Sequence, residues 1–403
     1  MMKNKKGFMT VYICLFFTTL VFLIGIFTSA VKESSVQSGA EALSRLWAQS
    51  ILAEYDLNLQ QRYHVFGFYG HPEDIKAKLT FYGEESYGSP SSKGWEISNC
   101  SLYAYSLRNT SVFKTQMIEA GKLALTDKFI KPEPNIRSVS NLKQVKADEL
   151  FQHLPSEGCK SNFFLDSMES LLGQKWSVKE LISKGCERYF ETKYILSHFN
   201  DYSREDKFKE SYFTQEAEYI ICGNKTDEAN QRGVKRRIIA IREVLNLLYL
   251  NENDRTRNEA LAVAEVLTPG AAAIVTQQTI LALWAYAESV NDYQLLVEGH
   301  QVPMKKTSQT WAIDLDSALS NTSEGYIYTG IDEGDSYLDY LQLMLYMMDE
   351  NILILRTMDL IQMNMRCFYY DGFFLQDYNG GLQFTVNVNN VPHEVKMCYD
   401  KKT

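Results

Sequence analysis

An uncharged, apolar run near the amino terminus constrains this chain more than any other feature. Residues 8–31 form a stretch of 24 that contains no charged side chain. With a rise of about 1.5 Å per residue, such a helix extends about 36 Å, which exceeds the ~30 Å hydrocarbon core of a bilayer. The run therefore predicts a membrane-spanning helix. We expect its anchoring side chains to include Phe8, Tyr12, Leu15, Phe16, Phe22, Ile26 and Val31.

The charges that flank this run are asymmetric. Residues 1–7, which precede the run, contain lysines and no acidic residue. Lys32 and Glu33 follow the run, and their opposite charges cancel. Because positively charged flanks stay in the cytoplasm, we expect residues 1–7 to be a cytoplasmic tail and the chain beyond residue 31 to lie outside. A cleaved secretory signal peptide is the alternative, but its apolar region normally spans only about 7–15 residues.

The start of the run is similar to a prepilin leader, in which cleavage follows a glycine. The corresponding segment here is Lys5-Lys6-Gly7-Phe8-Met9, so Gly7 and Phe8 mark the possible processing site. Prepilins usually carry Glu at the fifth position after the cut, where this chain has Tyr12. This difference favours an uncleaved, pilin-like anchor, and cleavage after Gly7 stays open.

Beyond the run, apolar residues recur at spacings of three and four, which is the period of one helix face. The stripe consists of Val36, Ala40, Leu43, Trp47, Ile51, Tyr55, Leu59 and Tyr63. It predicts an amphipathic stem over residues 32–66 that continues the membrane helix. We expect the stem to pack on the chain's own outer domain, with a partner subunit as the alternative.

The rest of the chain predicts an α+β fold, with helices packed on mostly antiparallel sheets. A polar stretch with Pro132 and Pro134 separates a small α+β region, residues 67–134, from a larger α+β domain, residues 135–403. Helices are expected at 111–125, 178–199, 228–250, 256–267, 271–290 and 336–365. Strands are expected at 78–82, 96–107, 212–222, 373–378, 382–388 and 394–399, the last two joined as a hairpin by residues 389–392.

Several segments, taken in their order along the chain, resemble one bacterial protein family. Among them are Thr10-Val11-Tyr12, the segments 50–56 and 62–67, Trp284-Ala285-Tyr286, and the segment 358–364. The family consists of single-pass proteins with TadE/TadG-like amino termini, encoded near tight-adherence (Tad/Flp) pilus genes in Gram-positive bacteria. The resemblance implies a structural or assembly role in a pilus at the bacterial cytoplasmic membrane, with other pilus subunits as partners. It supplies no catalytic residues.

Charge and motifs argue against several other functions. The chain has 41 Lys and Arg against 50 Asp and Glu, and this acidic balance argues against nucleic acid as a partner. It contains no glycine-rich phosphate loop, zinc-protease motif or serine-hydrolase motif. We therefore expect no cofactor, no small-molecule substrate and no enzymatic activity.

Two acidic groups keep an alternative open, an extracytoplasmic enzyme that acts on cell-wall polymer. Glu288 and Asp292 lie four residues apart and share one helix face, as paired carboxylates of a glycosidase do. Surface acids or ion pairs with Lys305 and Lys306 also explain them and are the favoured interpretation. The segment Asp332-Glu333-Gly334-Asp335 is similar to a cation-binding loop, but the start of a helix is favoured because acids stabilise helix amino termini.

The remaining candidate residues point to structure. Arg242 and Asn246 lie on one expected helix and Arg356 and Asp359 on another. Because a buried Arg or Asp needs a partner, we expect these four residues to form a structural polar network.

Six cysteines follow the membrane run. A disulfide between Cys367 and Cys398 is the pairing to test first, and free thiols are equally compatible with the sequence. The basic run Lys235-Arg236-Arg237 is expected to be a solvated helix face, with a contact to anionic wall polymer as the alternative.

Overall fold

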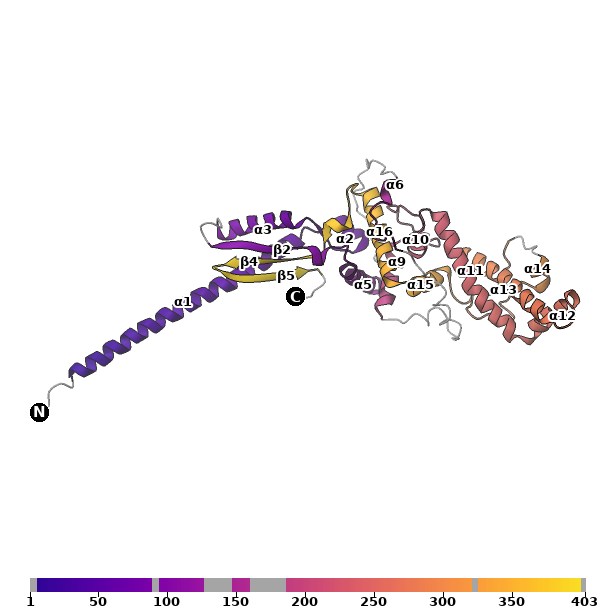
Figure 1. Cartoon of the computed structure of the whole chain (residues 1–403), viewed down its shortest axis with the longest axis horizontal. Helices are drawn as coiled ribbons and strands as arrows, with labels where there is room; N and C mark the ends of the chain where they lie inside the picture. Colours follow the sequence, from indigo (N-terminus) through magenta and orange to yellow (C-terminus); the bar gives the residue numbers. More distant parts are fainter. Residues whose placement is uncertain (1–5, 89–93, 127–146, 160–185, 321–324, 400–403) are drawn as a thin grey trace. The chain divides into compact units, whose positions relative to one another are not determined.

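The computed structural model describes residues 6–88, 94–126, 147–159, 186–320 and 325–399 (Figure 1). The fold is α+β, as predicted, with small antiparallel sheets and many helices. The chain divides into two compact units. The first unit contains residues 1–56, 66–109 and 376–403, and the second contains residues 57–65 and 110–375.

One long helix, α1, covers Lys6–Leu52 without interruption. It includes both the predicted membrane span and most of the predicted stem. The stem was expected to run to residue 66, but the helix ends at Leu52, and the following backbone leaves the helical path to form an isolated bridge. Tyr55 forms an antiparallel bridge with Phe68, and the amide of Asp56 donates to the carbonyl of Gly67 at 2.9 Å.

A three-stranded antiparallel sheet forms the centre of the first unit. Its strands are β2 (Trp95–Ser101), β4 (Gly381–Val388) and β5 (Val391–Cys398), in the order β2-β4-β5. Asn389 and Asn390 have φ values of 52° and 64°, as a two-residue hairpin turn of the primed type requires. The predicted carboxyl-terminal hairpin is therefore confirmed, but its turn is shorter than the expected connection 389–392, because Val391 and Pro392 already belong to β5. A separate two-stranded pair joins β1 (Phe68–Tyr69) to β3 (Tyr378–Asn379).

Helix α3 (Pro72–Tyr87) and the last turns of α1 pack on this sheet (Figure 1). The strand predicted at 78–82 is wrong, because this segment is the middle of α3. Its buried residues Ile75, Leu79 and Gly83 recur every four positions, as on one helix face. A Cβ on Gly83 would lie 2.2 Å from the ring of Trp95, so the indole packs directly on the helix backbone.

The two units differ from the domains expected from the sequence. We expected residues 135–403 to form one domain, but β4 pairs with β2 in register from Trp95↔Val388 to Ser101↔Gln383. The carboxyl-terminal hairpin therefore belongs to the same unit as residues 66–109. The expected boundary around Pro132 and Pro134 lies outside the described residues.

The second unit is built from helices. They are α2 (Leu57–Tyr63), α5 (Thr110–Thr126), α6 (Ala147–Leu150), α9 (Glu187–His198), α10 (Glu216–Cys222), α11 (Asp227–Glu252), α12 (Asp254–Leu267), α13 (Ala273–Val297), α14 (Leu315–Ser320), α15 (Tyr337–Met347) and α16 (Glu350–Phe368). Four of the predicted helices, at 111–125, 228–250, 256–267 and 271–290, are confirmed. The helix predicted at 178–199 is observed from Glu187, and residues 160–185 lie outside the described part.

Four other predictions need correction. The strand expected at 212–222 is helix α10, whose residues 216–221 are all buried, and a short buried run has no periodicity that separates the two structures. The helix expected at 336–365 divides into α15 and α16, because the side chain of Asp349 accepts from the amide of Ile352 and starts a new helix. Residues 375–377 of the expected strand 373–378 form a 3₁₀ turn. The strand expected at 96–107 ends at Ser101 and is followed by a 3₁₀ turn at Tyr103–Tyr105.

Candidate functional site

The first part of α1 exposes an apolar surface along the predicted span. Of the helices in the described part of the chain, α1 alone is long and apolar enough to cross a membrane, and none of its most apolar window is buried. The anchoring side chains predicted from the sequence are exposed by 62% (Tyr12), 57% (Leu15), 65% (Phe16), 72% (Phe22), 54% (Ile26) and 65% (Val31). Gly7 and Phe8 lie in α1, and their side chains are outside the part of the chain that the structure describes.

The last part of α1 has the opposite environment. Ala40, Ala48 and Ile51 are completely buried, and Trp47 is 5% exposed, in a core shared with the sheet and α3. The stripe in this part of the stem therefore packs on a folded unit of the same chain, the first unit, as expected. One continuous helix thus presents an apolar surface to its surroundings over one half and a buried stripe over the other.

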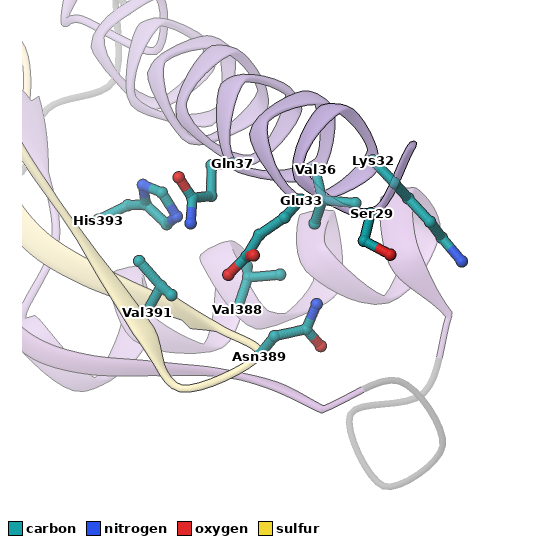
Figure 2. Close-up of a pocket in the computed structure, with 9 residues that line it drawn as sticks. All are labelled: Ser29, Lys32, Glu33, Val36, Gln37, Val388, Asn389, Val391 and His393. Atoms are coloured by element: carbon teal, nitrogen blue, oxygen red, sulfur yellow. The ribbon is translucent and has the colours of Figure 1, made fainter. Parts of the chain in front are cut away.

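A hollow of about 260 Å³ lies where the exposed half of α1 meets the β4–β5 hairpin (Figure 2). From α1 it is lined by Ser29, Lys32, Glu33, Val36 and Gln37, and from the hairpin by Val388, Asn389, Val391 and His393. Figure 2 shows Glu33 extending toward the hairpin and Gln37 lying near His393. The hollow therefore combines valine side chains with charged and amide groups.

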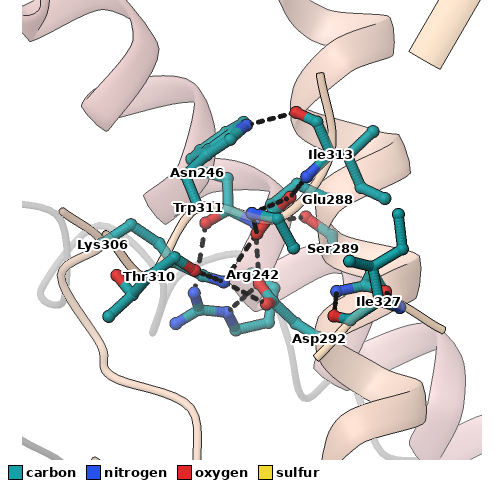
Figure 3. A network of polar contacts seen from close by, with 12 residues as sticks. Arg242, Asn246, Glu288, Ser289, Asp292, Lys306, Thr310, Trp311, Ile313 and Ile327 are labelled. Atoms are coloured by element: carbon teal, nitrogen blue, oxygen red, sulfur yellow. Dashed lines mark hydrogen bonds and ion pairs between the residues drawn. The ribbon is translucent and has the colours of Figure 1, made fainter. Parts of the chain in front are cut away.

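The second unit contains a buried charge cluster between α11, α13 and the segment that follows α13 (Figure 3). Arg242 Nε lies 2.9 Å from Asp292 Oδ2, and Lys306 Nζ lies 2.6 Å both from Asp292 Oδ1 and from Glu288 Oε1. Asn246 donates to Asp292 at 2.9 Å and to the hydroxyl of Ser289 at 3.0 Å. All these side chains are buried, so the cluster joins the two long helices internally.

The two carboxylates of this cluster respond differently to burial. Burial of Asp292 opposes its ionisation, but Arg242 and Lys306 outweigh this effect and hold its pKa below the usual value. Burial dominates at Glu288 and raises its pKa despite Lys306. Glu288 also accepts the amides of Ala312 and Ile313, the latter at 2.8 Å. Both carboxylates are therefore occupied by protein groups, in a position that has no exposed surface.

Glu288 and Asp292 were interpreted as surface acids or as ion-pair partners of Lys305 and Lys306. The surface interpretation is wrong, because both carboxylates are completely buried. The pairing with Lys306 is confirmed, whereas Lys305 lies 2.9 Å from Glu252 instead. The sequence could not separate these alternatives, because the helix spacing of Glu288 and Asp292 is the same in each.

The four residues assigned to one polar network divide between two. Arg356 Nη1 donates to the carbonyls of Ile220 and Ile221 at 2.8 and 2.9 Å. Asp359 accepts from the amide of Ser156 at 2.9 Å and from the hydroxyl of Tyr219 at 3.0 Å. This second cluster connects α16 with α10, while Arg242 and Asn246 connect α11 with α13. Burial raises the pKa of Asp359 to about 6.

Comparison with known proteins identifies the family. DUF5702, described as a family of unknown function, matches residues 126–390, which is more than half of the chain. This chain belongs to the DUF5702 family. No curated protein and no solved structure matches it. The DUF5702 match includes both buried clusters and the strand β4, and it leaves α1 outside.

Within the DUF5702 region, the structure shows two buried acids that the sequence analysis did not select. Glu216 accepts the amide of Asn200 at 2.7 Å, and Glu218 accepts the amide of Tyr202 at 2.9 Å. Tyr337 donates to the same oxygen of Glu218 at 3.0 Å. Burial raises the pKa of Glu218 to about 7. The only signal in the sequence was the pair of acids at positions 216 and 218, directly before an apolar run, and this segment was predicted to be a strand.

Two further expectations about the DUF5702 chain concern the pair Cys367 and Cys398 and the acidic loop at 332–335. Cys367 and Cys398 are both free cysteines in the structure; Cys367 lies on α16 of the second unit and Cys398 ends β5 of the first, so the disulfide between them stays a prediction. Ser336 caps α15 and forms a capping box with Asp339, which confirms that the acidic loop at 332–335 leads into a helix. In the described part of the chain, no three His, Cys, Asp or Glu side chains are grouped as metal ligands.

The basic run is only partly a solvated helix face. Arg236 is exposed, whereas Arg237 is half-buried and its Nη1 lies 2.5 Å from the sulfur of Cys222. Lys235 lies over the ring of Tyr293, 5.3 Å from its centroid. Two of the three cations therefore contact the protein itself, which leaves little of the run for an external polymer.

Proposed function

We propose that this DUF5702 protein is a membrane-anchored, pilin-like component of a tight-adherence-type pilus or a related bacterial surface apparatus, acting by protein contact. The observation that carries the proposal is the division of α1 into an exposed apolar half and a half buried in the first unit. An exposed apolar helix of this length requires lipid or protein around it, and the buried half fixes the anchor rigidly to a folded unit. The resemblance to single-pass proteins of pilus loci supports the same role.

The proposed topology is a single pass through the cytoplasmic membrane, with the amino terminus inside and both units outside. The lysines within residues 1–7 support this orientation, because cationic flanks remain on the cytoplasmic side. The acidic balance of the remaining chain imposes no contrary preference, since acids contribute little to orientation.

The corner between α12 and α13 supports a role in protein contact. Val266 and Leu267 are 81% and 62% exposed, and Ile274 and Val275 are 63% and 71% exposed. No charged residue occurs between Glu265 and Glu288. Contiguous exposed apolar side chains mark interaction surfaces, so this corner is our candidate for the contact with a second subunit of the apparatus.

The alternative of a wall-polymer hydrolase gains no support from the paired acids. A glycosidase needs two carboxyl groups on either side of an accessible bond, and Glu288 and Asp292 have no exposed side-chain surface. Both also bind Lys306, so neither is available as an acid or nucleophile toward a polymer.

Cross-linking and purification from the native membrane test the proposal. We expect the full-length chain to co-purify with pilus subunits, and its deletion to abolish or shorten pili. The double variant Val266→Ser/Ile274→Ser should reduce this recovery at least fivefold, whereas Leu319→Ser, exposed elsewhere in the second unit, should not. Normal piliation after deletion, together with no pilus subunit in the purified sample, would overturn the proposal.

A further inference from the structure

The hollow between α1 and the β4–β5 hairpin lies at the end of the proposed membrane span. The uncharged run ends at Val31, and the hollow is lined by residues 29–37 of α1. If the run spans the hydrocarbon core, these residues lie in the headgroup layer of the bilayer, where phosphate and ammonium groups are concentrated. The tip of the hairpin then lies in the same layer, because Val388, Asn389 and Val391 line the same hollow.

Polar groups are ordered along this hollow. Ser29 lies four residues, about one helical turn, nearer to the apolar run than Glu33, and Lys32 lies five residues nearer than Gln37, given a rise of about 1.5 Å per residue. In a zwitterionic phospholipid the phosphate is nearer to the acyl chains, and the ammonium group is farther out. The hydroxyl of Ser29 therefore lies at the height of the phosphate, and the carboxylate of Glu33 lies at the height of the ammonium group. Lys32 directly precedes Glu33, and its long side chain, which tilts toward the helix amino terminus, supplies the cation on the phosphate side.

The charged groups of the hollow are available to such a ligand. In the residues that the structure describes, neither Lys32 nor Glu33 belongs to an ion pair, although they are adjacent in the sequence. Nε2 of His393 is buried and has no hydrogen-bond partner there. A ligand that carries both charges would give Lys32 and Glu33 an opposite charge to pair with. It would also give His393 a hydrogen-bond partner, since imidazole donates or accepts according to its tautomer.

An apolar hollow adjoins the polar one on the side of the membrane run. It is lined by Phe27, Thr28, Val31, Lys32, Ser35 and Val36, and it shares Lys32 and Val36 with the first hollow. An acyl chain that follows the surface of α1 would lead directly from this apolar hollow to the polar one. The two hollows together therefore match one lipid molecule. Its acyl tail would lie in the apolar hollow, and its headgroup would lie in the polar hollow between α1 and the hairpin.

We propose that the hollow formed by Lys32, Glu33 and the β4–β5 hairpin binds the headgroup of a zwitterionic aminophospholipid. Lys32 and Ser29 bind the phosphate, and Glu33 binds the ammonium group. The bound lipid fills the space between the anchor and the sheet, and it holds the first unit against the membrane surface. This inference rests on the membrane span of the proposed function.

Native mass spectrometry of the full-length protein, delipidated in detergent and then supplied with phosphatidylethanolamine, tests the inference. We expect one retained lipid for each chain, and at least a fivefold smaller lipid-bound fraction in Lys32→Gln. Lys32→Arg should retain the lipid, because a guanidinium also binds phosphate. Arg45→Gln removes a cation that is exposed farther along the same helix and should leave binding unchanged.

A second variant tests the ammonium end. Glu33→Gln should weaken phosphatidylethanolamine binding and shift the preference at least threefold toward phosphatidylglycerol, which has no ammonium group. Equal lipid retention by Lys32→Gln and Arg45→Gln, or an unchanged preference in Glu33→Gln, would overturn the inference. Carbonate extraction of cell membranes that contain the protein distinguishes failure of the membrane anchor from failure of the lipid site. Release of the chain by carbonate contradicts the anchor itself. Retention of the chain in the membrane, without lipid selectivity in mass spectrometry, contradicts only the headgroup site.

Discussion

Arg242 on α11 and Asp292 on α13 form an ion pair of 2.9 Å in which neither side chain has any exposed surface. The pair joins α11 to α13 inside the second unit, and Asn246, Lys306 and Tyr340 complete its polar contacts. A buried pair of this kind costs desolvation energy that its partners must offset. Its role in this protein is therefore to fix how α11 and α13 pack, and removal of either partner leaves an uncompensated charge.

The first prediction concerns this pair. Asp292→Asn should destabilise the protein by about 3–5 kcal/mol, because Arg242 and Lys306 would remain buried without their shared counter-ion. Chemical denaturation of the detergent-solubilised protein measures the change. Lys305→Gln is the control, because its pair with Glu252 is exposed and should contribute at most about 1 kcal/mol. Equal midpoints for the two variants would contradict the structural role of the cluster.

The second prediction concerns pH. Burial raises the pKa of Glu218 to about 7, whereas the unfolded chain has a value of about 4.3. The folded state therefore binds a proton more tightly, so the stabilising contribution is complete below pH ~4.3 and is lost as the pH rises through 7. Asp359, with a pKa of about 6, acts in the same direction.

Glu218→Gln should remove its part of this dependence. The free energy of unfolding of the parent should fall by roughly 3 kcal/mol more than that of the variant between pH 4.5 and pH 8. Glu205→Gln, which changes an exposed acid, should follow the parent. Parallel pH profiles for the parent and Glu218→Gln would show that this carboxyl titrates normally.

The third prediction concerns Gly83 in the first unit. Gly83→Ala places a methyl group 2.2 Å from the ring of Trp95, so the indole must move and the protein should lose about 1–3 kcal/mol. Gly39→Ala is the matched control, because nothing lies within 4 Å of its added Cβ, and it should be neutral or stabilising by up to about 1 kcal/mol. Thermal unfolding followed by tryptophan fluorescence compares them. A more stable Gly83→Ala variant would be inconsistent with this packing.

The fourth prediction concerns the cysteines near the carboxyl terminus. Because Cys367 and Cys398 are free thiols, denaturation without reductant in the presence of a maleimide should label both. Peptide mass spectrometry measures the labels. A disulfide-linked peptide that contains both residues would contradict the expectation of free thiols.

Much of the fold follows from periodicity alone. The uncharged run and the stripe that includes Ala40 and Trp47 predicted α1, because both patterns extend over many turns. The hairpin at Asn389 and Asn390 was predictable because few residues adopt the left-handed backbone conformation that its turn requires. The strand expected at 212–222 failed because α10 is too short and too buried to show a helical period.

The buried clusters were only partly predictable. The spacing of Arg242 and Asn246, and the cost of burying an Arg, indicated that this helix face needs a polar partner. The partner Asp292 is 50 positions away along the chain, and no local pattern identifies such a contact. The same limit applies to β4, whose pairing with β2 decides which compact unit contains the carboxyl terminus.

Topology mapping by cysteine labelling tests the central claim most directly, that the exposed half of α1 spans the membrane and displays both units outside. In a variant without native cysteines, Ser38→Cys and Asn4→Cys are treated separately in intact cells with a membrane-impermeant maleimide. The account predicts labelling of position 38 in intact cells and labelling of position 4 only after permeabilisation. Labelling of both positions in intact cells, or protection of position 38 until the cells are opened, would contradict it.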